Sequence, residues 1–258
     1  MKEMIILKSK DEIEEIRYAS QIVIEVLQAL KEEAKPGIST WDLNAMAEEI
    51  TARRDSKPAF KGYRNYPASI CCAVNDEVVH GIPSKKKILK EGDILSIDFG
   101  VYRNGFYGDS AITVPIGDVS SEADSLLQVT RDSLYRGIEN AHPSNRLFDI
   151  SHAIQSHVEA EGFSVVTAFV GHGIGRKLHE DPQVPNFVPK NGNRWNGIRL
   201  KPGMVLAIEP MVNIGRPEIR ILNDGWTAVT EDGKLSAHFE HTVAITDNGS
   251  LILTEWGF

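Results

Sequence analysis

Four acidic residues stand at matching places in two similar stretches of the sequence, and carboxylates grouped in this way can hold metal ions. Asp98 lies inside one apolar run and Asp109 lies in the next, with Asn104 and Gly105 between them. A buried carboxylate is costly unless it is paired or binds a metal. Taken alone, however, the two aspartates fit a turn or the edge of a β-hairpin equally well.

A repeated pattern supports the metal-binding interpretation. The order Lys-x-Gly-x-aliphatic-Leu-small-Ile-acid occurs at residues 90–98 and again at 201–209, where it ends at Glu209. Three more matches keep the same order. Pro36 followed by Trp41-Asp42-Leu43 matches Pro143 followed by Phe148-Asp149-Ile150, and His80-Gly81-Ile82 matches His172-Gly173-Ile174. A second acid, Asp109 in the first half, matches Glu240 in the second. Such internal similarity indicates two halves of one plan. We expect one catalytic domain over residues 1–258, with pseudo-twofold halves at about 1–118 and 119–258 and the acids converging where the halves meet.

Convergence of these acids has a chemical consequence. Four carboxylates in one apolar cleft cannot all stay ionised without cations, because like charges raise each other's pKa. Two divalent ions bridged by carboxylates resolve this conflict, and such a pair suits hydrolysis by metal-activated water. His172 adds an imidazole, which favours Mn, Fe, Co or Zn over Mg or Ca. The glycines around His172 disfavour a helix and do not complete a dinucleotide-binding loop.

The elements that must position these residues are readable from the periodicity of apolar residues. Helices are predicted over about residues 11–35 and 41–54, the second capped by Ser39 or Thr40, and again over 122–139 and 148–160. Strands are expected at 69–74 and 163–170, and a hairpin at 95–112. The predicted class is therefore α+β. His142, His152, His157 and His241 have no matching context and are interpreted as surface or structural residues.

Composition narrows the class of protein further. The chain has 258 residues, of which 41% are hydrophobic and 25% charged, as in globular proteins. Its net charge of −8 argues against nucleic acid or an anionic membrane as the main partner. The two cysteines, Cys71 and Cys72, are adjacent, which fits a reducing compartment. With no visible signal peptide or membrane-spanning run, a cytoplasmic location is expected.

Six segments in this order resemble the type I methionine aminopeptidases. They are Tyr66-Pro67-Ala68-Ser69-Ile70-Cys71, Val74-Asn75 with Val78-Val79-His80-Gly81-Ile82-Pro83, Ile97-Asp98 with Gly108-Asp109, residues 171–176 with His179-Glu180, Ile208-Glu209-Pro210-Met211-Val212, and Glu240-His241-Thr242. These enzymes share the pita-bread fold with prolidase, aminopeptidase P and creatinase. The resemblance implies a central curved antiparallel sheet with helices on its outer face.

The resemblance also implies a site and a reaction. The metal ligands would be Asp98, Asp109, His172, Glu209 and Glu240, with Asp109 and Glu240 bridging two divalent ions, either Co, Mn, Fe or Zn. The reaction would be removal of the N-terminal methionine from nascent proteins whose second residue is small, by attack of a metal-bridging hydroxide on the scissile amide. Glu209 would shuttle the proton, His179 would stabilise the oxyanion, and His80 would meet the scissile nitrogen. The substrate would contact Phe60, Tyr63, Tyr66, Cys71, His80, Leu178, His179 and Trp226, although the aromatic residues alone would also fit a core.

The resemblance also predicts binding partners, and a few residues of this chain differ from the usual family pattern. The resemblance implies a monomer that acts on nascent polypeptides, with the ribosome as a candidate partner and with neither nucleic acid nor membrane bound directly. Leu178 stands where many members have Phe, Phe60 where some have Cys, and the loop Asn191–Gly197 has no assigned role.

Three alternative classes of protein fit the sequence less well. A prolidase or aminopeptidase P usually carries a large extra N-terminal domain. A metal-free binding protein should have lost ligands, and a mononuclear iron oxygenase would leave three carboxylates without a role.

Overall fold

The computed structural model describes residues 5–189 and 197–255, and it contains four long helices and several antiparallel sheets. The elements are α1 (Lys10–Glu33), α2 (Thr40–Arg53), β1 (Lys57–Pro58), a 3₁₀ turn η1 (Tyr63–Asn65), β2 (Cys71–Val74), β3 (Glu77–Val79), β4 (Ile94–Arg103), β5 (Phe106–Pro115), α3 (Ser121–Glu139), α4 (Leu147–Ala160), β6 (Ser164–Val165), β7 (Gly171–Gly173), β8 (Glu180–Val184), β9 (Val205–Ile208), β10 (Met211–Asn213), β11 (Ile219–Ile221), β12 (Ala228–Thr230), β13 (Ser236–His238), β14 (His241–Thr246) and β15 (Gly249–Ile252). This order confirms the predicted α+β class.

The first two helices begin at capping boxes. Ser9 accepts a hydrogen bond from the Glu12 N–H at the start of α1, and the Glu12 carboxylate accepts one from the Ser9 N–H. Ser39 and Asp42 form the same reciprocal pair at the start of α2, so the cap is Ser39 and Thr40 is the first helical residue. These bonds satisfy backbone groups that a helix cannot satisfy internally. The sequence placed both helix starts within one residue of their observed positions.

The predicted hairpin is formed by β4 and β5. Arg103 pairs with Phe106, and the tip residues Asn104 and Gly105 have positive φ angles of 49° and 87°. This two-residue turn is the kind that matches the twist of paired strands. Ala111 lies opposite Asp98 in the register. Because directly paired residues project from the same face, Asp98 and residues two positions along either strand share one side of the sheet.

A second sheet has the order β15-β14-β9-β7-β8, and an isolated bridge between Ala111 and Glu240 connects it to β5. In this sheet His172 pairs with Ala207, whose counterpart in the sequence repeat is Ser96. Ser96 pairs with Ala73. The place of His172 is therefore taken by Ala73 in the first sheet, and the sequence match with the His80 segment does not extend to the strand register.

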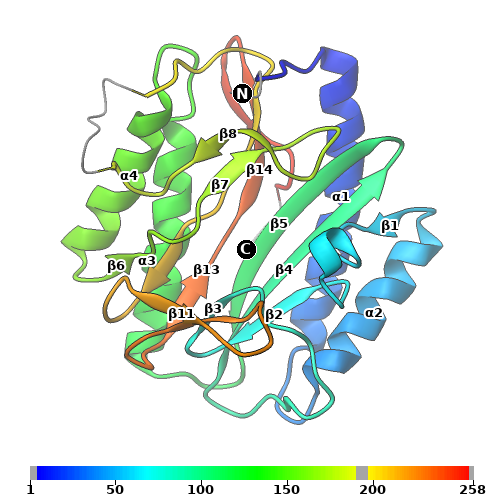
Figure 1. The fold of residues 1–258 in the computed structure, drawn as a ribbon, viewed down its shortest axis with the longest axis vertical. Helices are drawn as coiled ribbons and strands as arrows, with labels where there is room; N and C mark the ends of the chain where they lie inside the picture. Colours follow the sequence, from blue (N-terminus) through cyan, green and yellow to red (C-terminus); the bar gives the residue numbers. More distant parts are fainter. Residues whose placement is uncertain (1–4, 190–196, 256–258) are drawn as a thin grey trace.

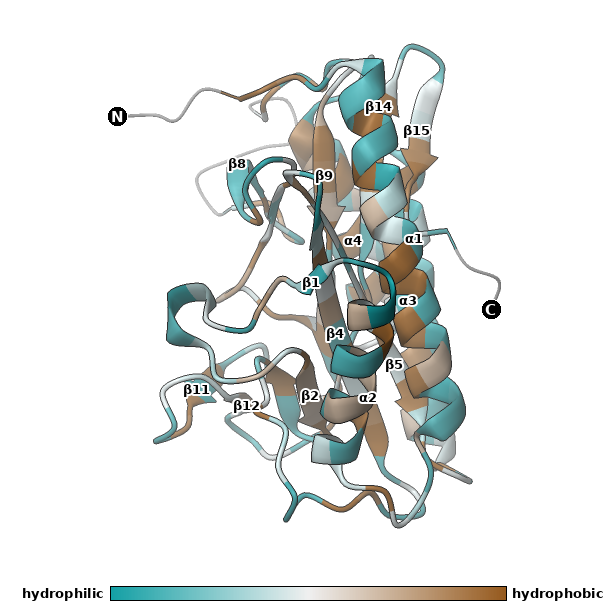
Figure 2. Cartoon of the chain, turned by 90° about the vertical axis from the view of Figure 1, so that its right-hand side faces the viewer, coloured by the Kyte–Doolittle hydropathy of each residue, from teal (hydrophilic) through white to brown (hydrophobic). Residues whose placement is uncertain are grey.

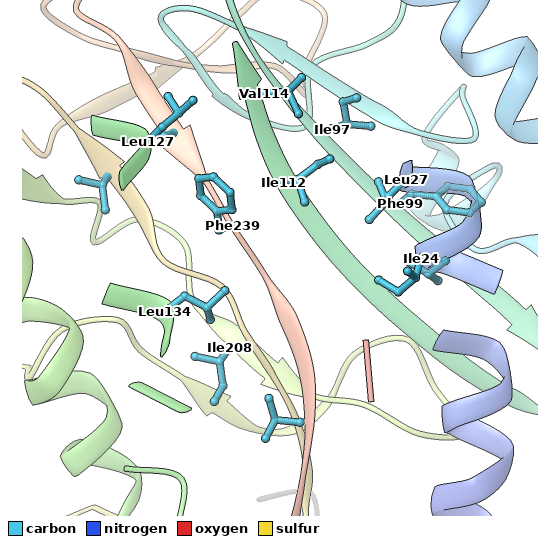
Figure 3. Packing of buried hydrophobic residues seen from close by; sticks show 14 of the residues in the cluster. Ile24, Leu27, Ile97, Phe99, Ile112, Val114, Leu127, Leu134, Ile208 and Phe239 are labelled. Atoms are coloured by element: carbon cyan, nitrogen blue, oxygen red, sulfur yellow. The ribbon is translucent and has the colours of Figure 1, made fainter. Parts of the chain in front are cut away.

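The four helices lie together on one side of the strands, with α1 and α2 beside one sheet and α3 and α4 beside the other (Figures 1 and 2). Figure 3 shows Leu27 of α1 packed near Phe99 and Ile97 of β4, and Phe239 facing α3. Ile97 and Phe99 are fully buried in this core. Because side chains alternate along a strand, Asp98 projects to the opposite face, away from the helices.

Residues 163–170 were expected to be rich in strand, but β6 covers Ser164–Val165 alone, because this segment mainly connects α4 to β7. The loop Asn191–Gly197 lies outside the described residues except for Gly197. No described helix is long and apolar enough to cross a membrane. The division of one domain into halves near residue 118 stays a prediction.

Candidate metal centre and active site

The acidic residues are aligned by the strand register on the face opposite the helices. Cys71 pairs with Asp98, Asp98 pairs with Ala111, and Ala111 forms the bridge to Glu240. These residues form one row across adjacent strands, so their side chains share a face. His241 pairs with Ile208, and continuing that register by one step sets Glu240 opposite Glu209. The row therefore joins carboxylates from both sheets.

Asp109 lies beside this row and depends on a glycine opposite it. Its strand partner is Gly100, two residues after Asp98. A Cβ atom at residue 100 would lie 2.9 Å from Phe60 Cε1 and 3.2 Å from Asp109 Oδ1. Since contacts under 3.0 Å require something to move, a larger residue at position 100 would displace the Phe60 ring and crowd the carboxylate. Gly100 therefore leaves room for both the acid and the aromatic wall.

His172 presents one ring nitrogen to the acids. Its Nδ1 lies 2.9 Å from the carbonyl oxygen of Gly173, and its Nε2 lies 3.5 Å from Glu209 Oε1. A carbonyl oxygen only accepts hydrogen bonds, so Nδ1 carries the proton and Nε2 keeps a lone pair. Burial lowers the pKa of His172 to about 4, which keeps the ring neutral at pH 7. A neutral imidazole with Nε2 available is a good metal ligand.

The donor set fits a divalent metal. One ligand atom from each of Asp109, His172 and Glu240 lies within 4.8 Å of the others, and all three side chains are buried. Asp98 Oδ1, Asp109 Oδ1 and Glu240 Oε1 are buried without a hydrogen-bond partner among the described residues. Buried carboxylate oxygens normally have donors or a cation. These unpartnered oxygens point to a cation as their partner, and the imidazole favours a transition metal or zinc.

Burial raises the pKa of every carboxyl group in the cluster. For Asp98 the next cause is the charge of Asp109 and then that of Glu209, and its pKa lies well above the usual range. Burial raises the pKa of Asp109 to about 7. The pKa values of Glu209 and Glu240 are also raised, first by burial and then by Asp109. Without a cation, the folded protein therefore retains protons that ordinary carboxyl groups lose near pH 4.

These shifts predict how the metal-free protein responds to pH. Its free energy of unfolding is expected to fall as the pH rises from about 6.5 to 8. In this range the folded cluster still binds protons that the unfolded carboxyl groups have released, so rising pH favours the unfolded chain. Buried histidines such as His172 act in the opposite direction, but only below the unfolded histidine pKa of about 6.5. The expected slope is about 1.4 kcal/mol per pH unit for each proton of difference.

Urea denaturation of chelator-treated protein at several pH values measures this slope. The matched variant Asp109→Asn should have a shallower slope, because it lacks the group whose pKa is about 7. A free energy of unfolding that stays constant or increases between pH 6.5 and 8 would contradict the predicted protonation of the cluster.

One pocket contains every residue that the sequence predicts for the site. Its lining comprises the predicted ligands Asp98, Asp109, His172, Glu209 and Glu240, the predicted substrate-contacting residues Phe60, Tyr63, Tyr66, Cys71, His80, Leu178, His179 and Trp226, and one further residue, Arg64. The apolar members belong to a second hydrophobic cluster, separate from the core beneath the helices. The structure thus brings together segments from both ends of the chain, while the role of each residue stays a prediction.

The aromatic wall of this pocket is fixed by ring contacts and hydrogen bonds. The rings of Tyr66 and Trp226 meet edge to face at 5.1 Å. The Tyr66 hydroxyl lies 3.0 Å from the carbonyl oxygen of Gly81 and 3.1 Å from that of Ile70. Edge-to-face contacts and a satisfied hydroxyl stabilise a buried tyrosine. The wall is therefore well supported by contacts and largely apolar, and it stands next to the carboxylates because Cys71 pairs with Asp98.

Two histidines outside the proposed ligand set line the pocket. The His179 ring is stacked on Tyr63, with centroids 5.2 Å apart, and its Nδ1 lies 2.9 Å from the Tyr63 hydroxyl oxygen. If that hydroxyl donates, the neutral ring carries its proton on Nε2 and can donate it to a ligand. His80 has a positive φ of 60° and meets the Phe169 ring edge to face. Burial lowers the pKa of both histidines, so both are neutral at pH 7.

Sequence reasoning missed two residues near the site. Arg64 lies at the pocket, and its guanidinium lies over the Tyr63 ring at 5.4 Å. His238 is buried, and its Nε2 is 3.7 Å from Glu209 Oε2. The signal for His238 was its place two residues before Glu240, which puts both on one face of an extended segment. His241, expected to be a surface or structural residue, is buried and bonds to Thr254, so it is structural.

The comparisons with known proteins agree on one family. The profile of metallopeptidase family M24 matches residues 14–247. A methionine aminopeptidase from Clostridium perfringens is 54% identical over 97% of this chain and 99% of its own length. Methionine aminopeptidase 1 of Bacillus subtilis is 53% identical over 97% and 99% of the two chains. The chain belongs to the methionine aminopeptidases of metallopeptidase family M24.

Solved structures support the same placement and confirm the predicted fold. The methionine aminopeptidase of Thermotoga maritima superposes with a TM-score of 0.95 at 46% identity, covering 98% of this chain and 100% of the other. A prolidase from Pyrococcus furiosus has a TM-score of 0.79 at 24% identity and is covered over 66% of its length. At that identity the prolidase shows the fold alone. Methionine aminopeptidases and prolidases thus share the pita-bread fold with this chain.

Proposed function

We propose that this protein removes the N-terminal methionine from polypeptides whose second residue is small, using two divalent metal ions. The observation that carries the proposal is the pocket that combines a cluster of carboxylates and one histidine with an aromatic, apolar wall. The first feature suits hydrolysis and the second suits an unbranched apolar side chain. Neither feature alone would select this substrate.

The proposed ligands are Asp98, Asp109, His172, Glu209 and Glu240. Asp109, His172 and Glu240 would provide the central donor atoms, and Asp98 and Glu209 would complete the set. When bound, the ions supply a Lewis acid for the scissile carbonyl and make water nucleophilic at neutral pH. The identity of the metal is one of Co, Mn, Fe and Zn, since imidazole together with carboxylates suits all four.

The side chains around the cluster orient the substrate. Phe60, Tyr63, Tyr66, Cys71, Leu178 and Trp226 form the methionine pocket. A flexible thioether adapts to an irregular apolar cavity and makes favourable contacts with aromatic rings. Leu178, where many members have Phe, and Phe60, where some have Cys, keep this wall apolar, and both are buried. The pocket therefore selects the first side chain by burial and shape.

Three groups act on the reacting atoms. Glu209 takes the proton of the attacking water and passes it to the leaving amine, which is general base and then general acid catalysis. His179 donates from Nε2 to the oxygen on which negative charge develops, and its bond to the Tyr63 hydroxyl holds it in that tautomer. His80, held against Phe169, contacts the nitrogen of the scissile amide.

The proposal predicts metal-dependent release of methionine. Peptides that begin with Met-Gly should be cleaved, a chelator should abolish the reaction, and Co²⁺, Mn²⁺ or Fe²⁺ should restore it. Chromatography of free methionine measures the product, and peptides with proline at the second position are the control for a prolidase-like specificity. Full activity of metal-stripped protein, or preference for the X-Pro peptides, would contradict the proposal.

The cellular setting follows from the substrate. An enzyme that acts on nascent polypeptides works in the cytoplasm, with the ribosome as a candidate partner, and we propose that it acts as a monomer. Elemental analysis of protein purified without added ions would show which metal is bound and so identify the physiological cofactor.

A further inference from the structure

The turn that carries His179 rests on a buried ion pair between distant parts of the chain. Lys8 Nζ lies 2.6 Å from Glu180 Oε2, and the two side chains are 3% and 6% exposed. Among the described Lys–Glu pairs this is the least exposed, since the pair Lys87–Glu77 is 26% and 13% exposed. Separating the partners of a buried pair leaves an uncompensated charge, which is strongly unfavourable. The two side chains therefore hold together the backbone segments that carry them. Glu180 directly follows His179 in the sequence.

Glu180 also holds the turn itself. Its second oxygen, Oε1, accepts a hydrogen bond of 3.0 Å from the Lys177 N–H, while the Gly175 N–H donates to the Lys177 carbonyl oxygen at 3.2 Å. The Lys8 stem packs against this turn so closely that a Cβ atom at residue 175 would clash with Lys8 Cε and Glu180 Oε1. The path of the turn and the position of the ion pair are therefore mutually dependent.

Lys8 is itself fixed, so it can act as an anchor. Its backbone N–H donates to the carbonyl oxygen of Gly203 at 2.7 Å, and its Nζ also donates to the carbonyl oxygen of Ile6 at 2.9 Å. The next residue, Ser9, caps α1. Gly203 leads into β9, the strand that ends just before Glu209. The ammonium group of Lys8 is thus held between α1 and β9, the strand that leads to the proposed metal ligand Glu209.

The position of the turn sets the position of the His179 ring. The ring lies 4.2 Å from the His172 ring, centroid to centroid, and stacks on Tyr63. A displacement of about 1 Å in a catalytic group can cost about 100-fold in rate. Among the described contacts the ring has a hydrogen bond to the Tyr63 hydroxyl and packs on the Tyr63 and His172 rings, and the backbone of the turn sets where these contacts are made.

We propose that Lys8 and Glu180 are positioning residues for His179. They do not touch the substrate, and they hold the turn so that Nε2 of His179 faces the reacting carbonyl group. The assignment rests on the proposed role of His179 in the reaction. It predicts that the effect of losing the ion pair passes through that one histidine.

The variant Lys8→Met tests this, because it keeps a long unbranched stem and removes the charge. We expect kcat for a Met-Gly peptide to fall by about 10- to 100-fold, the scale for losing support of a catalytic group. In the His179→Ala background, the same substitution should change kcat by less than about twofold, since effects of residues that act as a unit do not add. An ion pair that serves only stability would give the same fold change in both backgrounds.

Two further variants serve as controls. Lys87→Met removes a Lys–Glu pair of the same 2.6 Å length whose residues do not line the pocket, and it should leave kcat within about twofold of the parent value. The double variant Lys8→Met/Glu180→Gln leaves no unpaired buried charge, so it should recover folding stability relative to Lys8→Met. If the pair positions His179, the double variant should still have reduced kcat.

Amide hydrogen exchange gives a readout that does not depend on turnover. Exchange in a peptide that spans the turn, residues 174–180, should be faster in Lys8→Met than in the parent protein and unchanged in Lys87→Met. Unchanged exchange in this peptide, or equal losses of kcat with and without His179, would overturn the positioning role while leaving the proposed function intact. If His179→Ala alone retained full turnover, both the positioning role and the catalytic role of His179 would be overturned.

Discussion

Replacing Glu209 by glutamine is expected to lower kcat for methionine release by about 10³-fold or more, within the range for losing a general acid–base group. Glutamine keeps the shape of the side chain, but its neutral amide can neither carry the proton nor offer an anionic oxygen. The same change should weaken metal binding, because Glu209 Oε1 lies 3.5 Å from His172 Nε2 within the proposed ligand cluster. Steady-state kinetics and metal titration calorimetry measure the two effects.

The Glu209→Gln variant should also gain stability when the metal is removed. The pKa of the Glu209 carboxyl is raised by burial and by Asp109, so the unfolded chain releases this proton more readily than the folded, metal-free protein, which favours unfolding at pH 8. Thermal unfolding in a chelator at pH 8 should therefore give a higher Tm for the variant than for the parent, and with metal present the order should reverse. Glu231→Gln, an exposed carboxylate outside the pocket, is the control and should change neither activity nor Tm. Normal turnover in Glu209→Gln would remove this residue from the mechanism.

Replacing His179 by alanine is expected to lower kcat by about 10²-fold or more while leaving the metal content unchanged. That is the scale for losing one donor to a developing oxyanion. His179 lies outside the group of atoms that gathers at Asp109, His172 and Glu240, so its loss should not affect the ions. Kinetics on a Met-Gly peptide together with elemental analysis of the purified variant measure both quantities.

The companion variant Tyr63→Phe separates the tautomer of His179 from its presence. Phenylalanine preserves the stacking at 5.2 Å but removes the hydroxyl that lies 2.9 Å from Nδ1. The proton on Nε2 is then no longer favoured, so kcat should fall by a smaller factor than in His179→Ala. Near-normal turnover in His179→Ala would exclude the oxyanion role, and a loss of bound metal would identify His179 as a ligand instead.

Local patterns in the sequence determined much of this protein. The cap at Ser39, the helical periodicity that follows it and the Asn104–Gly105 tip act within a few residues, so their consequences are readable without a structure. The repeat of the Lys-x-Gly segment marked Asp98 and Glu209 as counterparts. The resemblance to the methionine aminopeptidases supplied the proposed ligands and the proposed roles of the histidines, and all of these residues line one pocket.

Only the tertiary structure decided which distant groups meet. Strand register is set by pairing between segments far apart in the sequence, and a shift of one residue turns a side chain to the other face. For this reason the repeat could not reveal that Ala73, rather than His80, occupies the place of His172. The same limit hid the closeness of His238 to Glu209 and the burial of Lys8 against Glu180. A charged residue near the start of a chain looks solvent-exposed in sequence, and only packing shows that the charge of Lys8 is paired with Glu180 next to His179.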